Sequence, residues 1–560
     1  MYKDFPVLTL PALLERSAKL FANESAVAFV GETPITYEEF YKRVQALVAQ
    51  LEKAGIKKGD KVALLSSNMP NWGVVYFALA YMGAVVVPLL PDFNEVEIEN
   101  ILEHSETKAM FVSRALIKKV ENFKGKNLKL RFHIEDFSAC QGEIVPFEIT
   151  AKPQKKYDIQ EEDLLAIIYT SGTTGKSKGV MLSHRNISFT AVASRSVEDI
   201  HPGDRFLSIL PLSHTYEQTI GFVLPIISGA AIYYLKKLPT PSVLLPVFKL
   251  VRPTMMLSVP LVIEKIYRNK ILPTFNKNKT IKTLYGIPFI RKILNRMAGK
   301  KLIETFGGEI KFFGIGGAKL DKTVEEFLWE AKFPYAIGYG LTETSPLLAG
   351  ANPRKMKLYS TGPILEGVQV KIHNPDPKTG EGEIWAKGPN VMIGYYKNPE
   401  QTKEVITEDG WFKTGDLGYI DEDGYLYIKG RLKNVIIGPS GENIFPEDIE
   451  SIINNFPGVL ESLVTEEKGK LVAMVHLNME EIEESYQHMK DKASDFSNFL
   501  EEKYDDIKKE LKDYVNSKVS RFSRIHEVMI QKEEFVKTAT KKIKRYLYSK
   551  SNNSDHKQMA

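Results

Sequence analysis

The feature that most constrains the fold is the alternation of helical and strand patterns in the first third of the chain. Apolar residues recur at helical spacing after a capping box at 36–39, and Gly55 ends the pattern. Short apolar strands at 61–65 and 84–88 lie on either side of a helical segment at 71–82. Strands that alternate with helices predict parallel sheets covered on both faces. The sequence therefore predicts an α/β fold.

Two further apolar strands, at 164–169 and 310–315, lead directly into turns rich in glycine. Proteins of the α/β class bind ligands at the carboxyl ends of their strands. We therefore expect both turns to contribute to a ligand site.

From about residue 362 the pattern changes to short strands separated by Asp-Gly, Thr-Gly and Asn-Pro turns. It predicts a small, mostly antiparallel β region at about 362–430. An α/β stretch follows, with a Lys- and Glu-rich helical segment at about 479–518. The tail at about 549–560 is polar and is predicted to be disordered. Because 560 residues exceed one typical core, we expect two or more domains.

Composition argues against two classes of protein. The chain has 75 Lys and Arg against 70 Asp and Glu, a net charge of +5, which is too small an excess to predict a nucleic-acid partner. Apolar stretches at 76–91 and 242–263 are interrupted by Gly, Pro or charge, so neither predicts a membrane span. The N-terminus lacks a signal-peptide pattern, and the single Cys140 cannot form an internal disulfide. We expect a cytoplasmic protein, with a peripheral contact to the inner face of the membrane left open.

The strongest local pattern is YTSGTTGKSKG at 169–179, directly after an apolar strand. Three glycines let backbone N–H groups approach an anion, hydroxyl groups add donors, and two lysines add positive charge. A flexible loop without a ligand is the alternative, but it accounts for neither the preceding strand nor the interleaved lysines. A P-loop is excluded because that motif requires glycine where Thr170 stands. The loop predicts a polyphosphate site.

Four motifs resemble those of the adenylate-forming, AMP-binding superfamily. They are the loop at 169–180, GYGLTET at 338–344, Thr-Gly-Asp at 414–416 with Gly-Arg at 430–431, and TATKKIKR at 538–545. The motifs occur in the family's order, and the resemblance covers nearly the whole chain. Among the members, the chain looks most like the long-chain fatty acyl-CoA synthetases.

The resemblance implies how the chain is organised. Residues 1–430 would form a large N-terminal adenylation domain of parallel α/β sheets, with the small β region at about 362–430. Residues 431–433 would form a hinge. Residues 434–560 would form a small mobile α+β domain that ends in the disordered tail.

The resemblance also implies the chemistry. A carboxylate attacks the α-phosphorus of ATP, pyrophosphate leaves, and a thiol then attacks the acyl-adenylate. Both reactants of the first step are anions, so the protein must supply positive charge and hold the reactants in position. The expected cofactors are ATP, Mg²⁺ and coenzyme A, the last as a substrate.

By resemblance, residues 170–174 and Lys178, in the loop after the apolar strand at 164–169, hold the β- and γ-phosphates of ATP. Tyr339 would stack on the adenine, beside the Gly-Gly-Ala turn at 316–318. Asp416 would accept the ribose hydroxyls, with support from Arg431. Thr342 would contact the α-phosphate, and Glu343 would ligate Mg²⁺. Taken alone, the Gly-Gly-Ala turn is equally well explained as a tight strand end. The implied ATP- and AMP-binding residues are Thr170, Ser171, Gly172, Thr173, Thr174, Lys178, Gly316, Gly317, Ala318, Gly338, Tyr339, Gly340, Asp416 and Arg431.

Three residues would act with the mobile domain. Lys433 occupies the hinge position, and Lys542 would bridge the carboxylate and the α-phosphate as a point charge. Gly441 would let the pantetheine arm of coenzyme A pass close to the backbone, although a plain turn also explains it. The family usually has glycine where Lys541 stands, so the register between Lys541 and Lys542 stays open. A basic tail that touches anionic lipid is the alternative reading of this motif.

The segment PLSHTYE at 211–217 resembles the family's acyl-pocket motif, with His214 beside the carboxylate; a packed structural histidine is the alternative. The His-x-x-Glu pattern, the segment 259–267 and the insertion before the terminal lysine motif resemble long-chain synthetases, although Leu261 replaces the usual arginine. We therefore expect a long-chain fatty acid–CoA ligase. An acyl–acyl-carrier-protein synthetase and an aryl or medium-chain acid–CoA ligase are the alternatives, and a catalytically silent nucleotide- or lipid-binding protein is a remote one. Fatty acid and coenzyme A are the expected partners, while an acyl carrier protein and a homodimer stay open.

Overall fold

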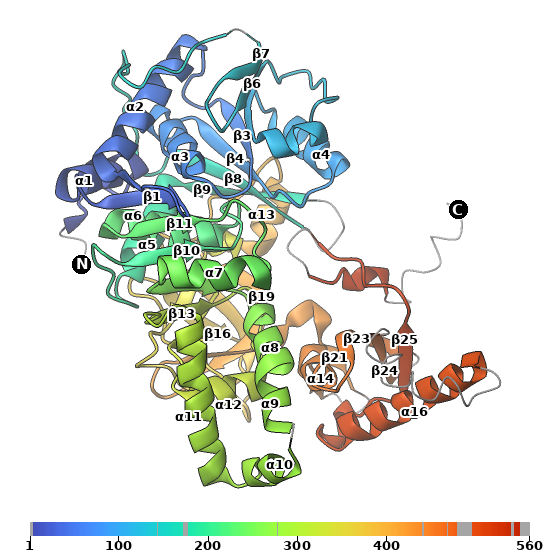
Figure 1. Cartoon of the computed structure of the whole chain (residues 1–560). Coiled ribbons are helices and arrows are strands. Elements are labelled where there is room, and N and C mark those ends of the chain that lie inside the picture. The colour runs from blue at the N-terminus through green and yellow to red at the C-terminus, as the bar shows by residue number, and fades with distance from the viewer. Residues whose placement is uncertain are drawn as a thin grey trace. The chain divides into compact units, whose positions relative to one another are not determined.

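The computed structural model describes residues 4–142, 144–171, 177–276, 278–438, 442–467, 469–478, 496–538 and 542–548. The chain divides into two compact units (Figure 1). Unit 1 comprises Met1–Thr414 and Tyr419–Tyr427, and unit 2 comprises Gly415–Gly418 and Ile428–Ala560. The hinge at 431–433 stays a prediction.

The first sheet of unit 1 has the strand order β18-β9-β8-β4-β3-β5-β6-β7. Its central strands β8, β4, β3, β5 and β6 are parallel, as predicted. At the edges, β9 pairs antiparallel with β8 and β18, and β7 pairs antiparallel with β6. The strands are β3 Lys61–Leu65, β4 Val85–Leu89, β5 Ala109–Val112, β6 Leu130–His133, β7 Ala139–Gln141, β8 Leu164–Ser171, β9 Ser177–Ser183 and β18 Gly394–Tyr395.

The second sheet of unit 1 has the strand order β15-β14-β13-β12-β10-β11-β1-β2. The six strands from β14 to β1 are parallel, and β15 and β2 close the edges in the antiparallel sense. The strands are β1 Ser25–Phe29, β2 Ile35–Thr36, β10 Arg205–Ser208, β11 Ala231–Tyr234, β12 Met255–Ser258, β13 Phe312–Ile315, β14 Tyr335–Gly340 and β15 Leu347–Gly350.

A layer of helices packs between these two sheets (Figure 1). Its centre is α3, in which ten of thirteen residues are buried, so the helix is apolar on every side. The ring of Phe222 lies 5.9 Å from that of Trp72 and 5.6 Å from that of Phe77. One apolar core therefore joins the two sheets. The helices of this layer are α1 Leu10–Leu20, α2 Tyr37–Lys53, α3 Pro70–Met82, α5 His184–Ser194, the π-helix η3 Tyr216–Val223 and α6 Leu224–Ser228.

The predicted capping box is confirmed at the start of α2. The backbone N–H of Glu39 donates to the Thr36 hydroxyl at 3.2 Å, and the Glu39 carboxylate accepts from the Thr36 N–H at 3.0 Å. The remaining helices of unit 1 are α4 Glu95–Ser105, α7 Pro241–Val251, α8 Pro260–Ile266, α9 Leu272–Asn276, α10 Lys279–Tyr285, α11 Pro288–Thr305, α12 Lys322–Ala331 and α13 Pro399–Val405.

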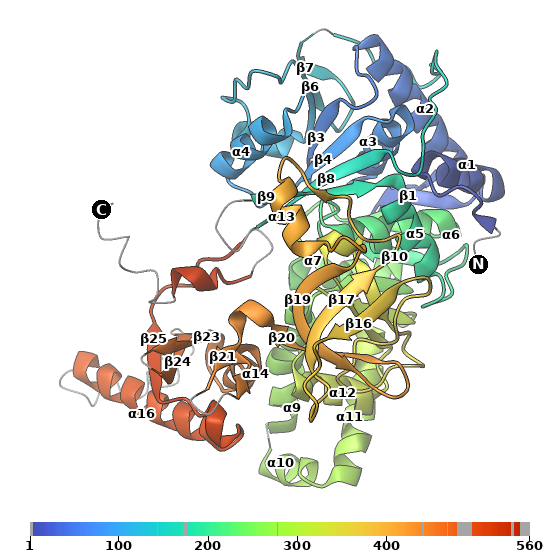
Figure 2. The same cartoon turned by 180° about the vertical axis from the view of Figure 1, so that it is seen from behind.

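The predicted β region is a third sheet, in the order β16-β17-β19-β20 (Figure 2). The pair β16 and β17 is antiparallel, as expected for strands joined by a Thr-Gly turn. Strands β16, β17 and β20 begin and end within a few residues of the strands predicted at 368–372, 382–386 and 425–428, whereas β19 was not predicted. The division between the two units passes through β19 and β20. The strands are β16 Gln369–His373, β17 Gly382–Lys387, β19 Phe412–Ile420 and β20 Leu426–Arg431.

In the described residues of unit 2, two helices pack on a three-stranded sheet. Strand β24 pairs antiparallel with β23 and parallel with β25, and α14 and α16 pack on the sheet. Helix α16 falls inside the predicted helical segment, whose part at 479–495 lies outside the described residues, as does the tail at 549–560. The elements are β21 Ile436–Ile437, β22 Asn443–Ile444, α14 Pro446–Ile453, β23 Val459–Glu467, β24 Lys470–Leu477, α16 Phe496–Asn516 and β25 Glu527–Gln531.

None of the helices in the described ranges is both long enough and apolar enough to cross a membrane.

Candidate active site

The site is built at the carboxyl ends of three neighbouring parallel strands in the second sheet. Strands β12, β13 and β14 pair in register, so the segments that follow them lie side by side. The N–H of Gly316, just after β13, donates to the carbonyl of Ser258 at the end of β12. Gly317 has φ +84°, a left-handed conformation that favours glycine. The predicted Gly-Gly-Ala turn, which ends at Ala318, therefore follows β13 at this edge.

Packing requires glycine at one predicted nucleotide-site position and leaves little space at a second. A Cβ at Gly340 would lie 1.7 Å from the carbonyl oxygen of Pro346, so the turn from β14 to β15 accepts no side chain there. A Cβ at Gly316 would lie 3.1 Å from the ring of Tyr216. These contacts provide structural reasons for residues that the sequence assigns to ATP, and Gly338 and Tyr339 lie in the same strand, β14.

Glu343 lies in a short 3₁₀ helix, η5 Thr342–Thr344, directly after that edge. Its carboxylate accepts a hydrogen bond from the hydroxyl of Tyr395 at 2.9 Å. The ammonium of Lys178 lies 5.0 Å from the centre of the same ring. Tyr395 thus joins the predicted metal ligand to the predicted phosphate lysine. No pattern in the sequence singles out this tyrosine, because the contact exists only once β18 pairs with β9.

The predicted phosphate loop connects two antiparallel strands. Thr170 pairs with Lys178, and Ser171 pairs with Ser177, at the end of the β8–β9 ladder. The hydroxyl of Tyr169 lies 2.8 Å from a ring nitrogen of His104, which fixes the base of the loop. Three of the predicted residues lie outside the described ranges: Gly172, Thr173 and Thr174.

His214 precedes the π-helix η3, and its Nδ1 accepts a hydrogen bond from the N–H of Tyr216 at 3.3 Å. An acceptor at Nδ1 places the proton of a neutral imidazole on Nε2. The backbone N–H of Gln218 also donates to the His214 carbonyl. The histidine is therefore partly structural, and its other nitrogen is a donor suited to a carboxylate.

The neighbouring Glu217 is 2% exposed. Burial raises the pKa of Glu217 to about 8, and the hydroxyl of Ser208 donates to its carboxylate oxygen at 2.5 Å. The Asn68 side chain in turn donates to that hydroxyl at 2.9 Å. Buried polar groups need such partners, so this network holds η3 against the end of β10.

A mostly apolar cavity runs along the second sheet, between the strands and the segment from α5 to α6. At one end it meets Gly338 and Tyr216, and toward the amino ends of the strands it meets Met255 and Phe312. Glu198, whose carboxylate lies 3.6 Å from Arg354, is the one charged residue among those that line it. The lining residues are Ser194, Val197, Glu198, Ile200, Phe206, Tyr216, Ile220, Leu224, Met255, Leu257, Phe312, Gly314, Ala336, Ile337, Gly338, Leu347, Gly350 and Ala351.

Unit 2 contains the other predicted residues. Asp416 in β19 is buried, and one of its oxygens lies 2.8 Å from Nε of Arg431, which is half exposed at the end of β20. The ion pair holds this buried carboxylate in a defined orientation. Lys433 lies in the 3₁₀ helix η6 Leu432–Asn434. Gly441 lies outside the described residues.

Lys542 is exposed, and ion pairs anchor the chain on both sides of it. Its backbone carbonyl accepts from the N–H of Thr538, whose hydroxyl accepts from the N–H of Lys542. Lys537 pairs with Glu461 at 2.6 Å, and Arg545 pairs with Glu450. Lys541 lies outside the described residues, so the register of the motif stays open.

Comparisons with known proteins show the family that the motifs resemble. Residues 14–396 match the family described as AMP-binding enzyme. The chain is 30% identical over 506 residues to the long-chain-fatty-acid–CoA ligase heimdall of Drosophila melanogaster, covering 80% of this chain and 73% of that protein. It is also 30% identical over 457 residues to the 2-succinylbenzoate–CoA ligase of Oceanobacillus iheyensis, covering 81% and 85%.

Among solved structures, the chain resembles the o-succinylbenzoate coenzyme A synthetase MenE of Bacillus subtilis in complex with ATP and a magnesium ion. The TM-score is 0.73 at 24% identity, and the match covers 95% of this chain and 98% of that one. This likeness confirms the predicted fold.

We expect Glu217→Gln to change how stability depends on pH. Glu217 is protonated in the folded chain up to about pH 8 but ionises near pH 4.5 when unfolded. Its contribution to stability is therefore present below pH 4.5 and is lost as the pH rises to 8, by on the order of 4 kcal/mol. The neutral amide should remove this loss. The free energy of unfolding of the variant, measured in urea, should therefore rise relative to that of the parent chain between pH 5 and pH 8. A constant difference across that range would contradict the buried, protonated state.

Proposed function

The chain belongs to the AMP-binding enzyme family, within the superfamily of AMP-forming acid–CoA ligases, and we propose that its acid is a fatty acid. The enzyme would activate the acid with ATP to an acyl-adenylate and transfer the acyl group to the thiol of coenzyme A. The observation that carries the proposal is the mostly apolar cavity in the second sheet.

The cavity, with a volume of about 50 Å³, suits the first methylene groups of an alkyl chain in both position and chemistry. One end lies at Gly338, next to Tyr339, the residue assigned to the adenine. An acid bound with its carboxyl at this end would extend along Leu257 and Phe206 toward the amino ends of the strands. Each methylene group removed from water contributes about 0.8 kcal/mol to binding. The apolar lining of the cavity therefore favours an alkyl chain over a small polar acid. Glu198, at the far part of the lining, offers no partner to a methyl end and disfavours a second carboxylate.

The residues near Glu343 fit ATP with Mg²⁺. This ion needs few protein ligands, because phosphate oxygens and water complete its octahedral shell. Within the described residues no cluster of three or more His, Cys, Asp or Glu could hold a metal, so one carboxylate with the phosphates is the arrangement that fits. The Tyr395 hydroxyl orients that carboxylate, and Lys178 adds charge on the phosphate side. When bound, the ion would neutralise the phosphate oxygens during attack.

Lys542 would supply the remaining positive charge. An exposed lysine with anchored residues on both sides can approach a substrate as a point charge. Asp416, with Arg431 beside it, would accept the ribose hydroxyls, and Gly441 would give the pantetheine arm its path. The assignments of Lys542 and Asp416 rest on the motifs together with the local geometry of unit 2, and that of Gly441 rests on the sequence alone.

Lys542→Ala should separate the two half-reactions. Adenylate formation, measured by exchange of labelled pyrophosphate into ATP, should fall by 10²-fold or more because the charge between two anions is lost. Thioester formation from supplied acyl-AMP and coenzyme A should stay within about threefold of the parent chain. Lys541→Ala is the matched control and resolves the register. Equal loss of both half-reactions would contradict the role given to Lys542.

Tyr395→Phe should lower the affinity for Mg²⁺ rather than remove activity. Without its hydroxyl the Glu343 carboxylate is less well oriented, and losses of about tenfold in metal affinity are typical of such partners. The Mg²⁺ concentration for half-maximal pyrophosphate exchange should therefore rise by about that factor. The adjacent Tyr396→Phe, which does not touch Glu343, should leave it unchanged. The same value in both variants would exclude Tyr395 as a positioning residue.

A panel of acids read by AMP formation tests the substrate class. The parent chain should prefer saturated fatty acids over coumarate, succinylbenzoate and acetate. Val197 is half-buried and lines the cavity, so Val197→Trp should narrow it. The fall in kcat/KM relative to the parent protein should therefore increase with the length of the fatty acid. Val96→Trp, at an exposed site on α4, is the control. A preference for an aryl acid, or equal loss for all lengths, would overturn the fatty-acid proposal while leaving the ligase chemistry intact.

A further inference from the structure

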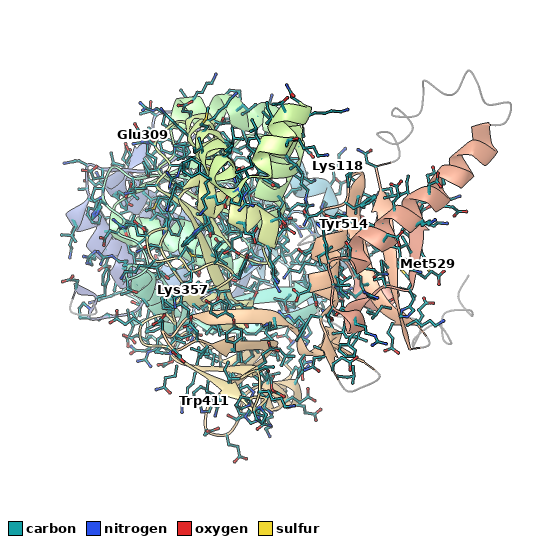
Figure 3. The ribbon with its side chains drawn as sticks, turned by 90° about the horizontal axis from the view of Figure 1, so that it is seen from below. Lys118, Glu309, Lys357, Trp411, Tyr514 and Met529 are labelled. Atoms are coloured by element: carbon teal, nitrogen blue, oxygen red, sulfur yellow. The ribbon has the colours of Figure 1, made fainter. Side chains whose placement is uncertain are left out.

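The segment from α9 to α11 extends from the second sheet as a group of helices at one end of unit 1 (Figures 1 and 2). Viewed from below, side chains point outward from these green helices (Figure 3). The longest of them is α11, Pro288–Thr305. None of the residues assigned to ATP, the acid or coenzyme A lies in this segment.

One face of α11 is fixed against α12. Both Nε and Nη2 of Arg291 donate to the Glu330 carboxylate, at 3.0 and 2.7 Å, and the Asn295 side chain donates to it at 2.8 Å. A Cβ at Gly299 would lie 2.3 Å from the carbonyl oxygen of Ala331, so the two helices are in close contact there. With Leu302 also buried, the orientation of α11 is determined, and its opposite face is exposed to solvent.

That opposite face carries large apolar side chains. Phe289 is 74% exposed, Ile293 43% and Met297 66%. Their spacing of four residues places them in one line along the helix. Leu284 and Ile287, just before the helix, are 38% and 46% exposed and extend the line toward α10. Exposed apolar residues that line up in this way indicate a contact surface rather than chance exposure.

The same surface is strongly basic. Residues 279–305 contain seven basic side chains and one acidic one, Glu304, a net charge of +6 in a chain whose total is +5. Arg291 is used in the contact with α12, while Lys292, Arg296, Lys300 and Lys301 are exposed beside the apolar line. Among the described residues, neither Arg296 nor Lys300 has a carboxylate within ion-pair distance. The basic residues are Lys279, Lys282, Arg291, Lys292, Arg296, Lys300 and Lys301.

The composition of the face selects its partner. Cores of protein–protein interfaces are depleted in lysine, whereas helices that lie in a membrane interface combine lysine and arginine with aromatic and aliphatic anchors. Each basic residue close to an anionic bilayer strengthens the attraction, and the apolar side chains enter the boundary between head groups and acyl chains. The exposed face of α11 combines lysine and arginine with aromatic and aliphatic side chains in the same way.

We propose that the face of α11 formed by Phe289, Ile293, Met297, Arg296 and Lys300 docks unit 1 on a membrane of anionic phospholipid. The helix lies in the interface and does not span the bilayer. This inference does not depend on which acid the enzyme uses, because the surface lies outside the proposed acid site.

Flotation of the full chain with lipid vesicles tests the proposal. The bound fraction should be small with phosphatidylcholine alone, should rise at least about tenfold when 30% phosphatidylglycerol is added, and should fall again in 0.5 M salt. Binding that is equal for both vesicle types, or absent from both, would overturn the proposal. The second outcome is expected if the face binds an acidic protein instead.

Matched variants locate the binding surface. Arg296→Glu with Lys300→Glu, and separately Phe289→Ser with Met297→Ser, should each lower binding to anionic vesicles by about tenfold or more. Lys118→Glu with Lys129→Glu reverses two exposed charges elsewhere on unit 1 and should bind as the parent chain does; Lys118 is labelled in Figure 3. Pyrophosphate exchange without vesicles should be unchanged in all three variants, which confirms that they fold. Equal loss in the Lys118 control would show general charge attraction and contradict a docking face on α11.

Discussion

Parallel pairing of β12, β13 and β14 determines where the chemistry of this protein is located. Because these strands are in register, the backbone that follows each of them emerges at one edge of the sheet. The Gly-Gly-Ala turn, the η5 helix and the end of β12 meet at this edge. The cavity and the π-helix pack against the faces of the same strands. The nucleotide residues of unit 1 and the acid cavity thus share one support, and a change in the pairing of these strands would displace both.

Much of the fold follows from local patterns. The capping box at Thr36 and the apolar runs before the glycine-rich turns depend on neighbouring residues, and the structure has elements at those places. Strand β9 was not predicted, since its glycine and lysines are typical of a loop, and only its pairing with β8 and β18 makes it a strand. The burial of Glu217 and the contact between Tyr395 and Glu343 arise from segments far apart in the sequence. No periodicity contains that information.

The roles of the conspicuous glycines illustrate the same distinction. Sequence motifs assign Gly316 and Gly340 to the nucleotide, and the packing gives each a further reason to lack a side chain. One residue type at one position meets two requirements, which the sequence cannot separate. Unit 2 shows the complementary case: the ion pairs of Lys537 with β23 and of Arg545 with α14 join the two ends of the terminal lysine motif to segments far away in the sequence, and the motif alone does not reveal these partners.

Strand β9 has one further consequence. It carries Lys178 on its ladder with β8 and pairs on its other side with β18, which carries Tyr395. Since side chains alternate across a strand, sliding either ladder by a single residue would turn a whole row of side chains to the opposite face. The spatial relation between the lysine and the tyrosine is therefore encoded in main-chain hydrogen bonds. The buried Val180 and Leu182 on the same strand hold this register against the core, so the geometry is set by the backbone together with the packing of β9.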